Sequence, residues 1–120
     1  MAVLGIDHVQ LAIPASGEER ARAFYADLLG LVELAKPLSL AQRGGVWFQC
    51  GSQQLHLGVE EPFRPARKAH PALLVDNLGT ILAKCRKTGI EVMQDEPLMG
   101  YARAFIHDPF GNRIELLQPT

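Results

Sequence analysis

The chain has 120 residues, of which 48% are hydrophobic, and a formal net charge of −1. This length suits one compact domain with its own core, and the absence of a dense basic stretch argues against nucleic-acid binding. No apolar run is long enough to span a membrane, and the two cysteines, Cys50 and Cys85, lie in apolar surroundings, so we expect a cytoplasmic protein with reduced thiols.

The first half of the chain predicts a strand, a helix and then further strands. Asp7–Ile13 alternates, with apolar side chains on one face and His8 and Gln10 on the other. Ser16 and Glu19 fit a capping box, which predicts a helix from about residue 17 to residue 29. Strands are expected next at Leu31–Ala35, Leu38–Gln42, Val46–Cys50 and Gln54–Val59.

The second half begins after a connector, Glu60–Ala69, which has two prolines and no periodicity. A strand is expected at His70–Val75, followed by a helix from about residue 78 to residue 88 that Asp76 or Asn77 caps. The strands expected after this helix are Ile90–Gln94, a short one near Leu98–Met99, Tyr101–His107 and Ile114–Gln118.

The two halves follow the same order of elements, which we write βαβββ. Gly30 and His56 are 26 residues apart, and Gly89 and Glu115 are also 26 residues apart. The fold class predicted is therefore α+β, with two βαβββ modules whose curved mixed sheets enclose a pocket and carry their helices outside. The single domain 1–120 divides into module one at about 1–59, the connector 60–69 and module two at 70–120.

The repeat matches His8 with His70 and His56 with Glu115. Alternation places each of these side chains opposite the apolar face of its strand. Three histidines and one carboxylate form a ligand set suited to Zn, Fe(II), Mn, Ni or Co. The alternative is a polar pocket without metal in which Glu115 pairs with one or more histidines.

Four stretches of the chain resemble the vicinal oxygen chelate superfamily, which includes glyoxalase I, bleomycin-resistance proteins, fosfomycin-resistance enzymes, methylmalonyl-CoA epimerase and extradiol dioxygenases. These stretches are DHVQLAI with His8, FYADLLGL at the helix end, HPALLVDN with His70, and DPFGNRIELLQP with Glu115. The resemblance covers nearly the whole chain and implies the paired-module fold.

The resemblance implies that His8, His70 and Glu115 hold a divalent metal ion. It places His56 where glyoxalase I and the epimerase have a fourth ligand or a catalytic group, so His56 and Glu115 are the candidates for catalysis. Glyoxalase I usually has a carboxylate at the position of His56, and this departure argues against a glyoxalase I activity.

Two functions follow as hypotheses. The first is a metal-dependent enzyme, of lyase, isomerase or dioxygenase type, that chelates adjacent oxygens of a small substrate. The second is a metal-free protein that binds a small molecule or drug, as bleomycin-resistance proteins do. Members with one module pair per chain commonly form dimers, so a homodimer is expected, with no nucleic-acid or membrane partner. Side chains on strands that border the expected substrate pocket are Trp47, Gln49, Tyr101, Arg103 and Phe105.

Overall fold

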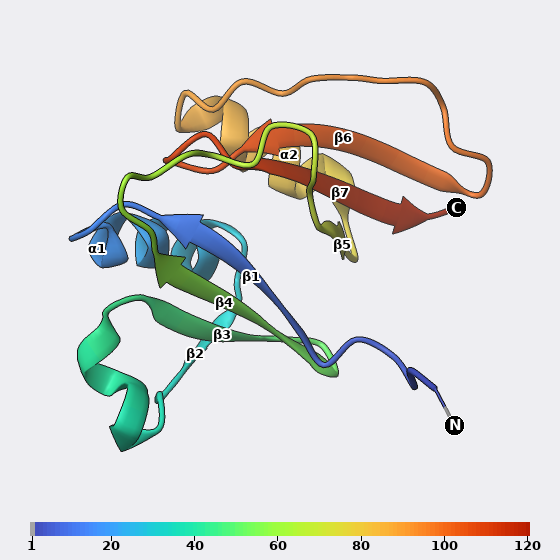
Figure 1. Cartoon of the computed structure of the whole chain (residues 1–120). Helices are drawn as coiled ribbons and strands as arrows, with labels where there is room; N and C mark the ends of the chain where they lie inside the picture. Colours follow the sequence, from blue (N-terminus) through green and yellow to red (C-terminus); the bar gives the residue numbers. More distant parts are fainter. Residues whose placement is uncertain (1) are drawn as a thin grey trace. The chain divides into compact units, whose positions relative to one another are not determined.

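A computed structural model describes residues 2–120 as two compact units, the first ending at Arg64 and the second covering Pro65–Thr120. Each unit contains one small mixed sheet and a helical segment (Figure 1). This is the α+β architecture that the sequence predicts. No helix within residues 2–120 is long and apolar enough to cross a membrane.

The first unit is built on four strands, β1 (His8–Ile13), β2 (Val32–Leu34), β3 (Val46–Cys50) and β4 (Gln53–Val59). Their order across the sheet is β1-β4-β3-β2. β1 runs parallel to β4, whereas the other neighbouring strands are antiparallel. The first and last strands of the unit therefore lie side by side.

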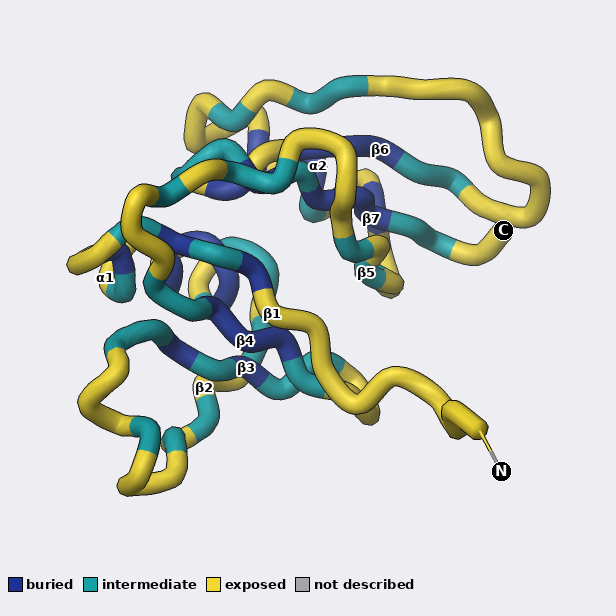
Figure 2. The backbone as a smooth tube through the Cα atoms, viewed as in Figure 1, coloured by how far each residue is buried: buried dark blue, intermediate teal, exposed yellow. Residues whose placement is uncertain are grey.

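A continuous helical segment packs on the apolar face of this sheet. It begins as α1 (Glu18–Ala21) and continues as a π-helical stretch, η1 (Arg22–Leu28). Phe24 and Tyr25 are buried, and the Tyr25 ring lies 5.8 Å from the ring of Phe48 on β3. Buried segments run along β1, β3 and β4, drawn in dark blue in Figure 2. The buried strand residues on this face form the core of the unit, and they are Leu11, Ile13, Val46, Phe48, Leu55 and Leu57.

The second unit has three strands and one α-helix. β5 (Ala72–Leu74), β6 (Tyr101–His107) and β7 (Arg113–Pro119) are arranged in the order β5-β7-β6. β5 is parallel to β7, which repeats the pairing of first and last strands. The helix α2 (Leu78–Lys87) begins at Asn77, whose side chain accepts a hydrogen bond from the Thr80 amide. Its buried side chains face the core of the unit with Ala104, Ile106, Ile114 and Leu116, and they are Leu78, Leu82 and Cys85.

The two sheets also share the same register. In the first sheet Gln10 pairs with His56, and in the second Ala72 pairs with Glu115. Gln10 and Ala72 each lie two residues after the histidine that the sequence repeat matched. The antiparallel neighbours correspond too, because β3 offers an aromatic residue opposite His56 and β6 offers one opposite Glu115. The spacing seen in the sequence therefore reflects a structural repeat.

Two predicted strands are wrong, and the short strand expected near Leu98–Met99 is only an isolated bridge between Leu98 and Tyr101. Leu38–Gln42 lies in a 3₁₀-helix, η2 (Leu38–Arg43), because Pro37 and the Gly44–Gly45 pair at its ends favour tight turns over an extended ladder. Ile90–Gln94 contributes only one isolated bridge, between Met93 and Phe105. The second unit consequently lacks the continuous strand that the first unit has as β2.

The predicted capping box is also wrong. Ser16 has a φ of +66° and lies one residue before the helix cap, Gly17, which has no side-chain hydrogen bond. Glu18 instead accepts a hydrogen bond from the Gly45 amide at 2.7 Å. An acidic side chain at the helix start is thus used to hold the loop before β3 rather than to cap the helix.

Candidate functional site

The polar face of the first sheet carries a stack of three aromatic rings. The His56 ring lies between Trp47, at a centroid distance of 3.8 Å, and His8, at 4.2 Å. The angle between the ring planes is 3° for the first pair and 19° for the second. The sheet register places Trp47 and His56 directly opposite each other, so neighbouring strands build this stack.

The surroundings of His56 favour its neutral form. The residue is only 4% exposed, and its Nε2 lies 2.8 Å from the side-chain oxygen of Gln54. Burial lowers the pKa of His56, the charge of His8 lowers it further, Asp7 opposes this change and Lys36 adds to it. With Nε2–H donating to the amide oxygen of Gln54, Nδ1 is the ring nitrogen that can accept a proton.

His8 has a carboxylate behind its ring. Its Nδ1 lies 3.0 Å from Oδ2 of Asp7, which leaves Nε2 on the other side of the ring. A carboxylate that contacts the second nitrogen of a histidine is a common arrangement behind metal-binding imidazoles. The His8 and His56 rings are nearly parallel, so their lone pairs, which lie in the ring planes, run side by side and do not converge on one ion.

In the second unit His70 contacts an oxygen at each ring nitrogen. Nδ1 lies 2.9 Å from the backbone oxygen of Lys68, and Nε2 lies 3.0 Å from Oε1 of Glu115. A neutral imidazole has only one N–H, so it can donate to only one of these two oxygens. If Nδ1–H donates to Lys68, the lone pair on Nε2 faces the lone pairs of a carboxylate.

Glu115 is fixed from two sides. Its second oxygen, Oε2, accepts a hydrogen bond from Nη1 of Arg103 at 3.1 Å, while Nε of Arg103 donates to the Glu96 carbonyl at 3.0 Å. The Glu115 residue is 6% exposed, so this carboxylate is buried but paired. Phe105 pairs with Glu115 across β6 and β7, and its ring centroid lies 4.1 Å from the guanidinium carbon of Arg113, within cation–π range.

With Nδ1–H donated to the Lys68 carbonyl, the facing acceptors of His70 and Glu115 would be bridged by a positive species. A second proton on His70 would serve, and so would a divalent ion bound by both groups. Their separation of 3.0 Å is close to that of two adjacent donor atoms which share an ion at about 2.1 Å each. The donor chemistry of this pair therefore fits a metal such as Zn or Fe(II).

The structure brings the four predicted ligands together in two pairs. His8 contacts His56 in the first unit, and His70 contacts Glu115 in the second. Within residues 2–120, no three His, Cys, Asp or Glu side chains are grouped so that they could hold a metal ion.

The five residues predicted to border a substrate pocket have different environments. Trp47 lines a cavity on the first unit and Tyr101 is 41% exposed, whereas Phe105 is buried and Arg103 is bound to Glu115. Gln49 donates to the backbone oxygens at both sides of the β3–β4 turn and thus stabilises this hairpin.

Sequence reasoning missed the groups that orient the histidines. Gln54 lies on the same strand face as His56, so strand alternation could have indicated their contact. Asp7 directly precedes His8, so its position in the sequence could have indicated the second contact. Lys68 acts through its backbone oxygen, which no side-chain pattern reveals.

Comparisons with known proteins agree on a family. The model of the glyoxalase/bleomycin resistance protein/dioxygenase superfamily matches residues 5–116. A crystal structure from Bacillus anthracis, described as a glyoxalase family protein, is 46% identical with a TM-score of 0.93, and the match covers 100% of this chain and 98% of that one. No curated protein matches the sequence.

More distant structures share the fold. Lactoylglutathione lyase from Agrobacterium tumefaciens is 22% identical with a TM-score of 0.71, over 95% of this chain and 92% of that one. A fosfomycin resistance protein from Listeria monocytogenes is 14% identical with a TM-score of 0.74, over 99% and 94% of the two chains. The family match over nearly the whole sequence, together with the similarity to the Bacillus anthracis protein, shows that this chain belongs to the glyoxalase/bleomycin resistance protein/dioxygenase superfamily.

Proposed function

We propose that this protein is a divalent-metal-dependent enzyme that acts on a small oxygenated molecule, by lyase, isomerase or dioxygenase chemistry. The observation that carries this proposal is the environment of His70, whose two ring nitrogens face the Lys68 carbonyl oxygen and Glu115 Oε1. This arrangement supports a metal-binding Nε2 with Nδ1–H held by the backbone. His8 is proposed as the third ligand, because Asp7 contacts its Nδ1 and leaves Nε2 to bind the ion.

The proposed metal would polarise adjacent substrate oxygens and stabilise the negative charge that develops there. The residues around it have separate tasks. Arg103 holds Oε2 of Glu115, so that Oε1 stays directed at His70. His56 is held through Nε2 by Gln54, and its Nδ1 is proposed to accept and return a proton. The parallel His8 and His56 rings favour this role over that of a fourth ligand.

The first test is elemental analysis of untagged protein purified without chelator. We expect close to one metal ion per chain in the wild type, and loss of that ion in His8→Ala, His70→Ala and Glu115→Gln. His107→Ala is the matched control, because His107 is the remaining histidine of the chain and is exposed. Absence of metal from the wild type, even after incubation with Fe(II), Mn, Ni and Zn, would contradict the proposal.

One observation favours the second candidate, a metal-free binding protein. Both oxygens of Glu115 already have protein partners, Arg103 and His70, so a doubly protonated His70 would satisfy this cluster without an ion. On this alternative the wild type would bind no metal, and Glu115→Gln would alter stability alone.

We also propose that two chains assemble, as members of the superfamily with one module pair commonly do. Several large apolar side chains on the described residues are open to solvent, including Leu4 at 97% and Leu74 at 71% exposure. Light scattering should give the mass of a dimer, and the mass of one chain would contradict this part of the proposal.

A further inference from the structure

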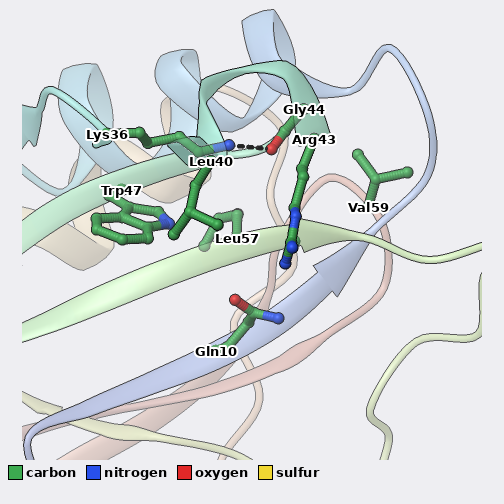
Figure 3. Close-up of a pocket in the computed structure, with 9 residues that line it drawn as sticks. Gln10, Lys36, Leu40, Arg43, Gly44, Trp47, Leu57 and Val59 are labelled. Carbon is green, nitrogen blue, oxygen red and sulfur yellow. Dashed lines mark hydrogen bonds between the residues drawn. The ribbon is translucent and has the colours of Figure 1, made fainter. Parts of the chain in front are cut away.

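The first unit contains a cavity of about 260 Å³ beside η2. It opens on the polar face of the sheet, and Trp47 forms part of its wall (Figure 3). The same Trp47 ring stacks on His56, so the cavity adjoins the proposed proton-transfer group. The residues that line it include Gln10, Lys36, Leu40, Arg43, Trp47 and Gly58.

Two cations line this cavity and no acidic side chain does. Within the part of the chain that the structure describes, Arg43 makes no hydrogen bond or ion pair, and its side chain extends across the cavity towards Gln10 (Figure 3). Lys36 donates one hydrogen bond from Nζ to the Gly44 carbonyl, which leaves further N–H groups of its ammonium to bind a ligand. The cavity therefore has a guanidinium, and part of an ammonium, that can still bind a ligand.

The Glu18 carboxylate lies near Gly44 and Gly45 but is already hydrogen-bonded to the backbone. Its Oε2 accepts the Gly45 amide at 2.7 Å, and this hydrogen bond is the main cause of the lowered pKa of Glu18. Of the charges that lower the pKa of Glu18, Lys36 contributes less than Arg22. Glu18 is therefore not an ion-pair partner of Arg43, which is exposed and open to a ligand.

The rest of the cavity wall includes apolar side chains, and the space inside the cavity depends on the absence of a side chain at Gly58. Leu40 and Trp47 supply an aliphatic and an aromatic surface. A Cβ added at Gly58 would lie 2.6 Å from Nε2 of Gln10, so any larger residue would displace this side chain. The volume is just below the roughly 300–1,000 Å³ of sites for drug-sized ligands, which limits the cavity to a compact molecule or to one end of a larger one.

We propose that this cavity binds the anionic end of the substrate, a carboxylate or phosphate carried on a compact apolar body. Arg43 and Lys36 bind the anionic oxygens, because a guanidinium and an ammonium are the side chains that pair best with them. Trp47 packs against the apolar body of the ligand and orients it along the polar face of the first sheet, on which His56 lies. The assignment of the ligand as substrate rests on the proposed function, whereas the anion binding itself does not.

Intrinsic fluorescence tests the proposal directly, since Trp47 is the single tryptophan of the chain. Phenyl phosphate, benzyl alcohol and inorganic phosphate would each be titrated into protein from which metal has been removed by dialysis. We expect saturable quenching by phenyl phosphate, with affinity at least about tenfold weaker for the neutral alcohol and for inorganic phosphate. Equal affinity for benzyl alcohol would overturn the role of charge, and equal affinity for inorganic phosphate would overturn the role of the apolar wall.

Variants separate the cavity from a general charge effect. Arg43→Gln should weaken phenyl phosphate binding about tenfold, and Lys36→Gln by a similar factor. Gly58→Ala should weaken it without any change of charge, while Arg67→Gln, which removes an exposed cation of the second unit, should bind as the wild type does. Wild-type affinity in Arg43→Gln would refute the site. Phenyl phosphate binding in a protein that takes up no metal would support this inference and contradict only the proposed function.

Discussion

The polar faces of the two sheets carry different side chains at the equivalent position, His56 in the first sheet and Glu115 in the second. In the first unit His56 is stacked between two rings and bound to the amide of Gln54, in surroundings that lower its pKa. In the second unit Glu115 is a carboxylate bound to Arg103 and His70. The backbones repeat, so the difference comes from the neighbouring side chains.

This difference shows how one fold can divide two tasks between its halves. An uncharged imidazole among aromatic rings is suited to accept and return a proton. A carboxylate that a guanidinium orients is suited to hold a cation beside His70. The repeat positions these groups, and their immediate partners determine what each can do.

The largest expected effect comes from matched substitutions at the two register positions. Glu115→Gln should destabilise metal-free protein by about 3 kcal/mol, because it leaves the half-buried Arg103 without its counter-charge. His56→Gln should cost only about 1 kcal/mol, since it removes ring stacking but no charge pair. Urea unfolding measures both free energies.

His107→Gln provides the control for these two variants. His107 is exposed, so its replacement should change the free energy of unfolding by less than about 0.5 kcal/mol. Equal losses for Glu115→Gln and His56→Gln would show that the two faces do not differ in the way described.

The turns of the β3–β4 and β6–β7 hairpins allow a second comparison, of the side-chain hydrogen bonds that stabilise them. Asn112 is fully buried; its side chain donates to Asp108 at 2.9 Å and accepts the Ala66 amide at 2.8 Å. Asn112→Ala should therefore cost about 2 kcal/mol, whereas Gln49→Ala, which loses two exposed hydrogen bonds, should cost about 0.5 kcal/mol. If chemical denaturation gives the reverse order, the second hairpin is not held by its side chains.

A smaller effect concerns the acid dependence of the first unit. The Gly45 amide lowers the pKa of Glu18 below that of an unfolded carboxyl. Glu18 therefore contributes stability above its unfolded pKa, and this contribution is lost as the pH falls through its folded pKa. Glu18→Gln should cost about 1 kcal/mol at neutral pH and nothing once the pH is below both pKa values. A difference from the wild type that stays constant with pH would contradict this.

The equivalence of His56 and Glu115 could be predicted from the sequence. Strand alternation and the equal spacing of 26 residues both correspond to the register that the two sheets adopt. The cavity could not be predicted. Its cations, Lys36 and Arg43, flank a segment in which alternating leucines favoured a strand, while Pro37 and the glycines that follow turn the chain into η2.

The strand expected at Ile90–Gln94 also differs from the structure. Only Met93 pairs there, with Phe105 of β6. Local sequence patterns register the strand-forming residues of Ile90–Gln94, but the extent of pairing with another strand depends on contacts that are distant in the sequence.

The state of each histidine ring tests the central claim most directly, and long-range ¹H–¹⁵N NMR spectra report it. In metal-free protein His56 should carry its proton on Nε2, which faces Gln54, and His70 should carry a proton on Nδ1, which faces the Lys68 carbonyl oxygen. Addition of Zn should shift Nε2 of His70 and Nε2 of His8, while His56 and His107 stay unchanged. An Nε2 of His70 that does not shift in excess Zn would contradict the account.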